Sequence, residues 1–298
     1  MSDQPTDIVF DALHRMESNG AHAHATIAAL ARLQATAASA PTLTRPISTR
    51  TDAPPPSRET EPMPRLGSAL FAAAPPSSIG ATPAATPGSK AEKLAALRGP
   101  VLACTRCEHL VKSRTQVVFG VGNPEAELMF IGEAPGADED LVGEPFVGRA
   151  GQLLTKMIEA MNFKRSDVYI ANILKCRPDT PPGESGNRKP TRPEMEVCKP
   201  YLLQQIEIIQ PKVLVALGAT AVEGLLNIEK AGITRMRGTW KEFHGIPLMP
   251  TFHPSFLLRP SHEQLANKRL VWEDMLAVLE RLGHAITAKQ RGYFLTKS

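Results

Sequence analysis

Three side chains capable of chemistry come at or just after the ends of separate apolar segments: Glu133, Asn172 and His253. If those segments are parallel strands of one sheet, their carboxyl ends meet at the edge where open α/β sheets bind ligands. A single surface glutamate or buried histidine is common and carries little information. A carboxylate, an amide and an imidazole at one edge together favour an active site.

The four cysteines form a second candidate site. Cys104 and Cys107 are a C-x2-C pair, whereas Cys176 and Cys198 are single and far apart in the sequence. A zinc ribbon usually has two such pairs, while four dispersed thiolates suit a 4Fe-4S cluster. We therefore expect a cluster with a structural role. Structural zinc and unligated core cysteines are the alternatives.

Strand and helix patterns alternate along the chain after about residue 91, and these elements must position the candidate residues. Apolar runs predict strands and helical spacing predicts helices: strands over 128–132, 168–174, 213–218 and 246–253, and helices over 149–162, 193–210, 219–226 and 263–282. Such alternation implies a parallel sheet covered on both faces. The predicted fold is α/β, a three-layer α/β/α sandwich with a central, mostly parallel, four-stranded sheet.

The first 90 residues differ in composition from the rest. Pro, Ala, Ser and Thr dominate 38–90, which predicts a disordered linker because such a stretch buries too little apolar surface to fold. Residues 1–37 contain a weak helical pattern, for which we expect a protein partner rather than chemistry. The catalytic domain is expected over 91–284, followed by a tail over 285–298.

Composition and charge set broad limits on function. The net charge of +4 and the isoelectric point of about 8.9 permit nucleic-acid binding without requiring it. The N-terminus has no signal-peptide pattern, and no apolar run reaches the roughly 18 residues of a membrane span. We expect a cytoplasmic monomer without membrane association, a compartment in which structural disulfides are rare.

Four sequence blocks resemble the family 4 uracil-DNA glycosylases, the iron–sulfur type. The blocks are GEAPGADED at 132–140, GEPFVGRAGQLL at 143–154, IANILKCRP at 170–178 and FHPSFLLR at 252–259. They occur in the family's order and cover most of the predicted domain. The resemblance implies a DNA-repair hydrolase that flips uracil out of uracil-containing DNA and hydrolyses its N-glycosidic bond, leaving an abasic site for base excision repair. It also implies a 4Fe-4S cluster on the four cysteines.

The resemblance further assigns a base pocket to the residues Gly132, Ala134, Phe146 and Asn172. Phe146 would stack on the base, and Asn172 would read its O4 and N3–H groups, which favours uracil over cytosine. Backbone amides beginning at Gly132 would orient the base. Ala134 occupies the position at which other uracil glycosylases have an aspartate.

Two residues are implied in bond breaking. His253 would donate a hydrogen bond to uracil O2, where negative charge develops. Glu133 would hold the attacking water or stabilise the cationic sugar. The alternative is that Glu133 is structural and that Asp138 or Glu139 has this role.

Contacts to DNA are predicted from residues near the same edge: Arg149, Lys175, Ser255 and Arg259, which would bind phosphates. Leu257, in the run Phe256-Leu257-Leu258, would fill the space left by the flipped nucleotide. The alternative is that these apolar residues begin a helix and face the core.

Three other functions fit the sequence less well. A covalent uracil-trapping relative would carry a compact basic insertion with a histidine before the last strand, which is missing from 227–247. A non-enzymatic iron–sulfur DNA-binding module would not need Glu133, Phe146, Asn172 and His253 together. A nucleotide-dependent oxidoreductase is disfavoured because no G-x-G-x-x-G motif is present.

Overall fold

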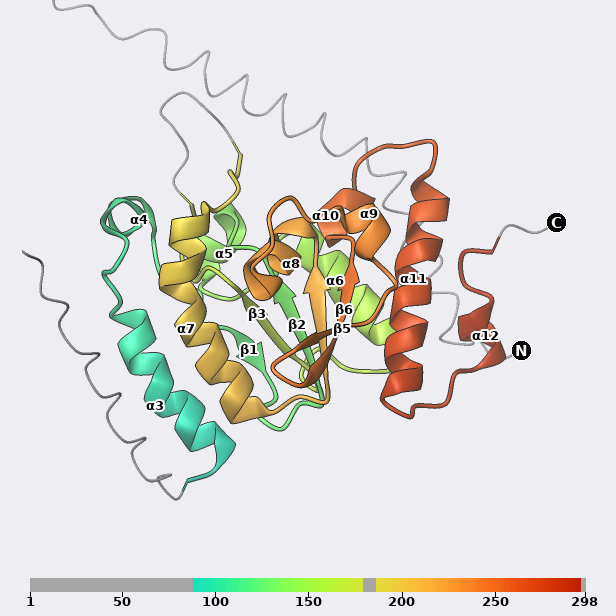
Figure 1. The fold of residues 1–298 in the computed structure, drawn as a ribbon, viewed down its shortest axis with the longest axis horizontal. Helices are drawn as coiled ribbons and strands as arrows, with labels where there is room; N and C mark the ends of the chain where they lie inside the picture. Colours follow the sequence, from blue (N-terminus) through green and yellow to red (C-terminus); the bar gives the residue numbers. More distant parts are fainter. Residues whose placement is uncertain (1–87, 179–185, 296–298) are drawn as a thin grey trace, which may run out of the picture. The chain divides into compact units, whose positions relative to one another are not determined.

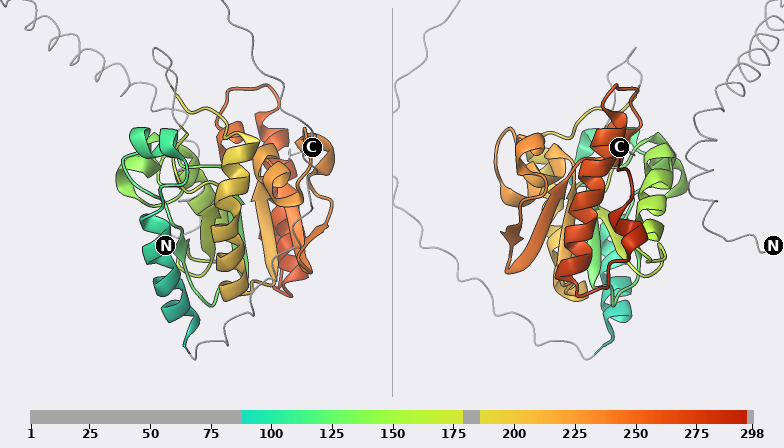
Figure 2. Two further views of the ribbon diagram at one scale, coloured as in Figure 1. Left: turned by 60° about the vertical axis from the view of Figure 1, so that its left-hand side comes forward. Right: turned by 90° about the vertical axis from the view of Figure 1, so that its right-hand side faces the viewer.

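A six-stranded mixed sheet lies at the centre of the part of the chain that the structure describes (Figure 1). The computed structural model describes residues 88–178 and 186–295, all within one compact unit, Ala85–Ser298. Helices cover both faces of the sheet, so the predicted α/β class is confirmed (Figure 2). The helix predicted over 1–37 and nearly all of the linker predicted over 38–90 lie outside the described residues.

Four parallel strands form the middle of this sheet, and two short antiparallel strands form its edges in the order β1-β3-β2-β4-β6-β5. The parallel strands are β2 (Leu128–Gly132), β3 (Tyr169–Asn172), β4 (Val213–Leu217) and β6 (Ile246–Thr251), and the edge strands are β1 (Val121–Gly122) and β5 (Lys241–Phe243). The sheet therefore has six strands where four were predicted. The additional strands have two and three residues, too few to produce a sequence pattern.

The register of the parallel strands aligns their carboxyl ends. Gly132 at the end of β2 pairs with Asn172 at the end of β3. Leu217 at the end of β4 pairs with Thr251 at the end of β6. Residues that follow these four strands consequently start from one edge of the sheet.

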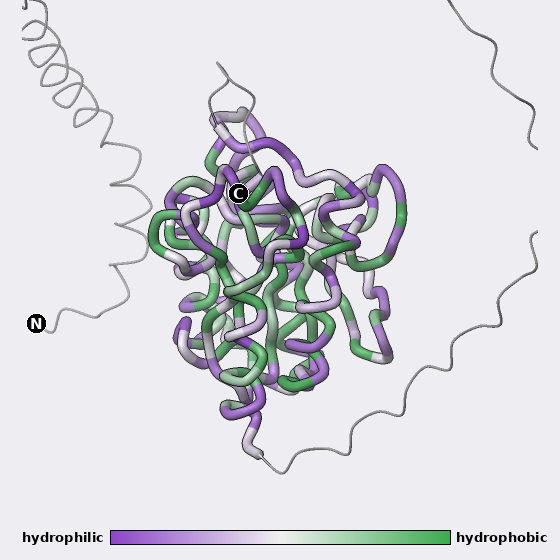
Figure 3. The backbone as a smooth tube through the Cα atoms, turned by 90° about the vertical axis from the view of Figure 1, so that its left-hand side faces the viewer, coloured by the Kyte–Doolittle hydropathy of each residue, from purple (hydrophilic) through white to green (hydrophobic). Residues whose placement is uncertain are grey.

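Alternate residues of each strand point into two separate cores. Met129 and Ile131 belong to one apolar cluster, and Leu128 and Phe130 belong to the other. The first core lies under α3 (Lys90–Leu102), α7 (Arg192–Ile209) and α8 (Ala219–Leu226), and the second lies under α6 (Arg149–Ala160) and α11 (Gln264–Arg281). All residues of β2 and β4 are buried, as expected for parallel strands covered on both faces. Figure 3 shows hydrophobic stretches interleaved with hydrophilic ones along the backbone of the described residues.

Five short helices complete the described part: α4 (Glu108–Ser113), α5 (Ala137–Val142), α9 (Ile233–Met236), α10 (Pro254–Leu257) and α12 (Ala288–Arg291). The last of these lies within the segment expected to be a tail. The indole N–H of Trp272 on α11 donates to the carbonyl oxygen of Gln290 across 2.6 Å. The side chain of Gln290 donates to the carbonyl oxygen of Ala160 at the end of α6. The C-terminal segment thus packs against two helices of the sandwich.

Local signals explain where the long helices begin and end. Thr191 and Glu194 form a capping box at the start of α7, within a residue of the predicted start. Its end is set by Gln210 in the left-handed conformation, immediately before Pro211. Ser89 caps α3, a helix that the sequence pattern did not predict. No helix within 88–178 or 186–295 is both long enough and apolar enough to cross a bilayer.

Candidate active site

Gly132 is the point at which the predicted pocket residues meet. A Cβ atom on Gly132 would lie 2.4 Å from Oδ1 of Asn172 and 2.5 Å from Cζ of Phe146. Both side chains therefore pack directly against the glycine backbone at the end of β2. Only a residue without a side chain lets both approach the backbone so closely.

Phe146 is held in an unusual backbone conformation. Its φ is +55°, and its side chain is buried. A Cβ on Gly151 would lie 1.8 Å from the carbonyl oxygen of Phe146, so α6 also approaches this residue through a glycine. Glu139 accepts hydrogen bonds from the N–H groups of Val147 and Gly148 at 2.9 and 3.0 Å. These contacts fix the Phe146 ring 5.6 Å, centroid to centroid, from the ring of His253.

His253 follows β6 and is the N-cap of α10. The backbone N–H of Ser255 donates to Nδ1 of His253 across 3.1 Å, and the Ser255 hydroxyl lies 2.7 Å from the same atom. Because Nδ1 accepts a hydrogen bond from a backbone amide, the ring proton is on Nε2. Burial, with a smaller effect of Arg259, lowers the pKa of His253 to about 4. The ring is therefore neutral near pH 7 and has an N–H donor on Nε2.

Asn172 carries an unpaired polar atom. The residue is 2% exposed. Its Oδ1 is, among the described residues, the one buried side-chain nitrogen or oxygen without a hydrogen-bond partner. Leaving a buried acceptor unpaired costs about 1–3 kcal/mol. Such an atom beside Phe146 and Gly132 is consistent with a ligand that donates a hydrogen bond there.

Glu133 is the next residue after Gly132. It is half-buried and hydrogen-bonded to the side chain of Thr220 in the first turn of α8. Burial raises its pKa, which the bond to Thr220 partly offsets. Ala134, the neighbouring residue, packs against the first core.

The two alternative carboxylates lie in different surroundings. Glu139 accepts hydrogen bonds from three backbone N–H groups, those of Gly136, Val147 and Gly148. Its carboxylate therefore holds the loop around Phe146. Asp138 is exposed, and its Oδ2 would lie 2.4 Å from a Cβ on Gly148.

The end of β6 is anchored by a buried ion pair. Thr251 donates to Asp274 on α11 across 2.6 Å, and Nε of Arg237 donates to the same carboxylate across 3.0 Å. Burial raises the pKa of Asp274 to about 6. Because Thr251 is two residues before His253, this pair fixes the strand end from which His253 projects.

The predicted DNA contacts separate into two groups. Arg149 and Arg259 are exposed and Ser255 is half-buried, so all three are accessible. Lys175 is 1% exposed, and its ammonium donates to Oε1 of Gln205 across 2.6 Å. This corrects the prediction that Lys175 binds phosphate, because its side chain turns into the core beneath α7.

The prediction for Leu257 is corrected in the same way. Leu257 is 3% exposed and belongs to the second core, as the alternative proposed. Phe256, the preceding residue, is 36% exposed and packs against Phe252 at a centroid distance of 4.6 Å. The first residue of the apolar run, not the second, is therefore available for contact.

All four cysteines contribute to the first apolar core, with Cys176 and Cys198 buried and Cys104 and Cys107 half-buried. Burial raises the pKa values of Cys107, Cys176 and Cys198, that of Cys198 to about 12, and the charge of Cys104 raises them further. No three Cys, His, Asp or Glu side chains in 88–178 and 186–295 are arranged as ligands of a single metal ion. The four thiols thus lie in or against the same apolar core, but within the described residues they do not form a ligand group for a single metal ion.

Two groups near the cysteines were not identified from the sequence. Arg114 donates to Sγ of Cys176 across 2.9 Å and to the carbonyl oxygen of Cys104 across 2.7 Å. The position of Arg114, a few residues after the C-x2-C pair, does not indicate these contacts. They form because the fold brings the segment after β3 close to Arg114.

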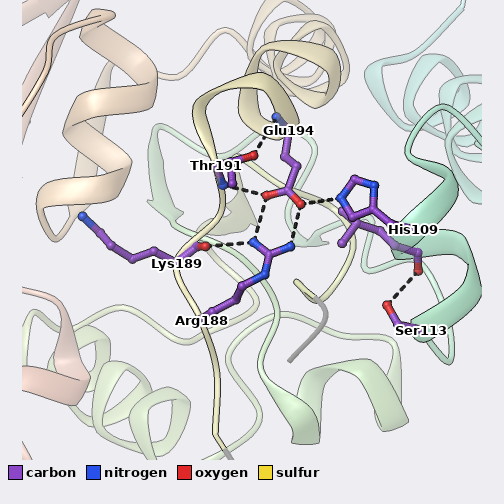
Figure 4. A network of polar contacts seen from close by, with 7 residues as sticks. His109, Ser113, Arg188, Lys189, Thr191 and Glu194 are labelled. Atoms are coloured by element: carbon purple, nitrogen blue, oxygen red, sulfur yellow. Dashed lines mark hydrogen bonds and ion pairs between the residues drawn. The ribbon is translucent and has the colours of Figure 1, made fainter. Parts of the chain in front are cut away.

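The second group is the network around Glu194 (Figure 4). The carboxylate of Glu194 accepts from Arg188 at 2.7 and 3.0 Å and contacts Nε2 of His109 at 2.6 Å. Although burial alone would raise the pKa of Glu194, these bonds hold it at about 2. The network joins α4, next to Cys107, to the start of α7, which carries Cys198.

Comparisons with known proteins agree with this arrangement. The model of the uracil DNA glycosylase superfamily matches residues 119–276. A type-4 uracil-DNA glycosylase of Thermotoga maritima is 47% identical over 174 residues, which are 58% of this chain and 85% of the relative. A type-4 enzyme of Archaeoglobus fulgidus is 44% identical, covering 53% and 79%. A type-5 uracil-DNA glycosylase of Pyrobaculum aerophilum is 27% identical, covering 60% and 87%.

Proposed function

The chain belongs to the type-4 uracil-DNA glycosylases of the uracil-DNA glycosylase superfamily, and we propose that it removes uracil from DNA in base excision repair at the pocket around Gly132. A base inside a duplex is inaccessible, so the nucleotide must leave the stack to enter such a pocket. Phe146 offers an aromatic face to the extruded base, and the bare backbone of Gly132 lets the side chains of Phe146 and Asn172 lie close together.

The unpaired Oδ1 of Asn172 is the observation that carries this proposal. Uracil presents an N3–H donor next to an O4 acceptor, which matches the carbonyl and amide groups of one Asn side chain. Cytosine reverses both groups and would leave two polar atoms unpaired. The N3–H of uracil satisfies the acceptor that has no partner in the free protein, so recognition also removes an existing desolvation cost.

His253 would act on the leaving group. As the bond between C1′ and N1 breaks, both electrons go to uracil, and negative charge develops on its O2. The neutral His253 ring can donate its Nε2–H to that oxygen without first losing or gaining a proton. One preorganised donor of this kind contributes about 2.7–4 kcal/mol to the transition state.

Glu133 would act on the sugar. Water adds its oxygen to C1′ and gives up a proton, while the departing uracil anion takes one up. Glu133 follows Gly132 directly, and its carboxylate, which has a side-chain hydrogen bond to Thr220, would orient the water or stabilise the cationic sugar. Glu139 is a weaker candidate, because three backbone amides already occupy its carboxylate.

Arg149 and Arg259 are proposed to bind phosphates on either side of the flipped nucleotide. Both are exposed, at the start of α6 and just after α10. Ser255 would contribute a further polar contact while keeping its bond to His253. We propose Phe256 in place of Leu257 as the apolar side chain that fills the vacated position in the stack.

We also propose that Cys104, Cys107, Cys176 and Cys198 hold a 4Fe-4S cluster with a structural role. The donor set fits, because a cubane binds each thiolate at a different iron and so spreads its ligands more widely than a single ion does. The spacing, one C-x2-C pair and two single cysteines, favours this choice over zinc, which usually has two such pairs. When bound, the cluster would tie the segment between α3 and α4 to β3 and α7.

The proposed activity is tested with an oligonucleotide that contains one uracil, followed by alkali. We expect strand scission at uracil and none in a matched oligonucleotide with thymine there. Asn172→Ala should lower kcat/KM about tenfold or more, since an unpaired buried group costs about 1–3 kcal/mol. Asn123→Ala, in the loop after β1, should leave it unchanged. Absence of scission by the unaltered protein would refute the activity, and full activity of Asn172→Ala would refute the site.

A further inference from the structure

Arg114 connects two of the segments that carry cysteines. It caps the C-terminal end of α4. Its guanidinium donates one hydrogen bond to Sγ of Cys176 and another to the carbonyl oxygen of Cys104, across 2.9 and 2.7 Å. Cys104 comes before α4 and Cys176 follows β3, so one side chain joins two parts of the ligand set that are distant in sequence.

Arg114 also borders a cavity. It lines a cavity of about 480 Å³ together with Arg98, Gln116 and Glu144, and with further residues of α3 and β1. None of the four cysteines lines this cavity, although Arg114 contacts Cys176 directly. Arg114 therefore contacts both the cavity and the sulfur atom of a cysteine that does not line it.

Lys175 contacts the cysteines through its main chain, while its cationic side chain is buried in the core. Its backbone N–H donates to Sγ of Cys198 across 3.2 Å. In the described part of the chain, its ammonium donates to the neutral side chain of Gln205 and not to a carboxylate. Gln205 is itself fixed, because its amide donates to the carbonyl oxygen of Phe119 and to the hydroxyl of Tyr169.

A buried ammonium without a carboxylate is costly unless another negative charge lies near it. Four cysteine thiolates with their cluster supply such a charge. We propose that Arg114 and Lys175 are positioning residues for the cysteine ligands. The Arg114 side chain holds Cys104 and Cys176 in place, and the two cations, Arg114 and the buried ammonium of Lys175, balance the negative charge of the ligand set. The inference rests on the cluster proposed above. It also gives Lys175 a role other than contact with DNA.

The test compares the full chain with Arg114→Gln, Arg114→Lys and Lys175→Met, all purified without oxygen. Arg98→Gln is the matched control, because Arg98 lines the same cavity but packs over Phe119. The measurements are iron content, the rate at which visible absorbance is lost to an iron chelator, and the midpoint potential. Hydrogen bonds and charges at the sulfur atoms set that potential, whereas a purely structural contact does not.

We expect Arg114→Gln to lose absorbance at least several-fold faster than the unaltered protein. At a fixed potential, its ratio of reduced to oxidised cluster should fall about tenfold. This corresponds to a midpoint potential lower by about 59 mV for a one-electron couple. Lys175→Met should shift the potential in the same direction. Arg114→Lys, which keeps the charge but not both bonds, should shift it less, and Arg98→Gln should not.

Two results would overturn the inference, and they are distinguishable. If the unaltered protein contains iron but neither Arg114→Gln nor Lys175→Met changes the potential, the roles assigned to these residues are wrong and the cluster stands. If the unaltered protein contains no iron, the cluster proposal falls with the inference, while uracil release still tests the activity separately. Should Arg114→Gln not fold, Arg114→Lys and Lys175→Met decide the question.

Discussion

The backbone N–H of Ser255 donates a hydrogen bond to Nδ1 of His253, and this bond fixes which nitrogen of the ring carries its proton. An ordinary histidine has a pKa of about 6.5, but burial lowers that of His253 to about 4. Protonation of Nδ1 would remove the acceptor of the Ser255 N–H and so disrupt the bond that orients the ring. Titration of His253 should therefore not reduce uracil release between about pH 8 and 6, and the loss should appear only as the pH approaches about 4.

The same pKa shift affects stability with a definite sign. The folded pKa of His253 lies below its unfolded value, so the unfolded chain binds more protons between the two. Stability contributed by the neutral ring is present above about pH 6.5 and is lost as the pH falls toward about 4. The unaltered protein should thus lose more in Tm between about pH 7.5 and 5 than His253→Asn does. Equal losses of Tm in the two proteins would contradict the lowered pKa of His253. His262→Asn is the control, because His262 is exposed and its replacement should leave the Tm loss of the unaltered protein unchanged.

Gly132→Ala should abolish most activity. The new methyl group would lie 2.4 Å from Oδ1 of Asn172 and 2.5 Å from the Phe146 ring, so both must move. Displacement of reacting groups by about 1 Å can cost about 100-fold in rate, and we expect a loss of that order in kcat/KM. Gly99→Ala is the control, because a Cβ there meets no atom within 4 Å. If the two variants were equally active, the pocket would lie elsewhere.

Phe256→Ala and Leu257→Ala should impair different properties. Leu257→Ala should mainly lower stability, and Phe256→Ala should mainly weaken DNA binding. Leu257 is buried in the second core, so its truncation should lower the free energy of unfolding by about 2–5 kcal/mol. Phe256 is partly exposed, so its truncation should mainly weaken binding to uracil-containing duplex. Denaturant unfolding and a binding titration measure the two effects. A larger loss of duplex affinity for Leu257→Ala, at temperatures where it is folded, would restore the original assignment.

Arg149→Ala and Arg259→Ala should each weaken DNA binding equally for all sequences. Each neutralised phosphate contributes about 0.9 to the slope of log K against log salt on duplex DNA, so each variant should reduce the slope by about one. Arg192→Ala is a matched control, because Arg192 is paired with Glu229 and Asn227. Unchanged slopes for Arg149→Ala and Arg259→Ala would place the phosphate contacts on other residues.

Strong local patterns allowed much of the fold to be predicted. The four parallel strands are continuous apolar runs, and α7 is bounded by a capping box and a proline. β1 and β5 carry no comparable pattern, and α3 buries mainly Leu94 and Val101, which leaves it without a clear apolar face. Such elements are specified by what packs against them, which a single sequence does not reveal.

The sequence indicated where the candidate site lies, but not the directions in which its side chains point. The position of a residue after a strand indicates that it lies at the sheet edge, and Asn172 and His253 do lie there. It does not indicate where a side chain points once the strand has ended. Lys175 and Leu257 are both next to motif residues and both turn into the core. The bonds of Arg114 and Glu194 depend on segments brought together by the fold, so they also could not be anticipated.

The order of the strands along the chain has a consequence for biosynthesis. Phe146 and Asn172 are translated well before His253, which follows the last parallel strand, β6. β6 reaches the sheet by pairing with β4, so the ring of His253 arrives beside Phe146 only when that strand docks. A nascent chain that still has β6 inside the ribosome therefore carries Asn172, the proposed reader of the base, without His253, the proposed donor to the leaving group. Under this proposal, uracil release becomes possible only near the end of synthesis.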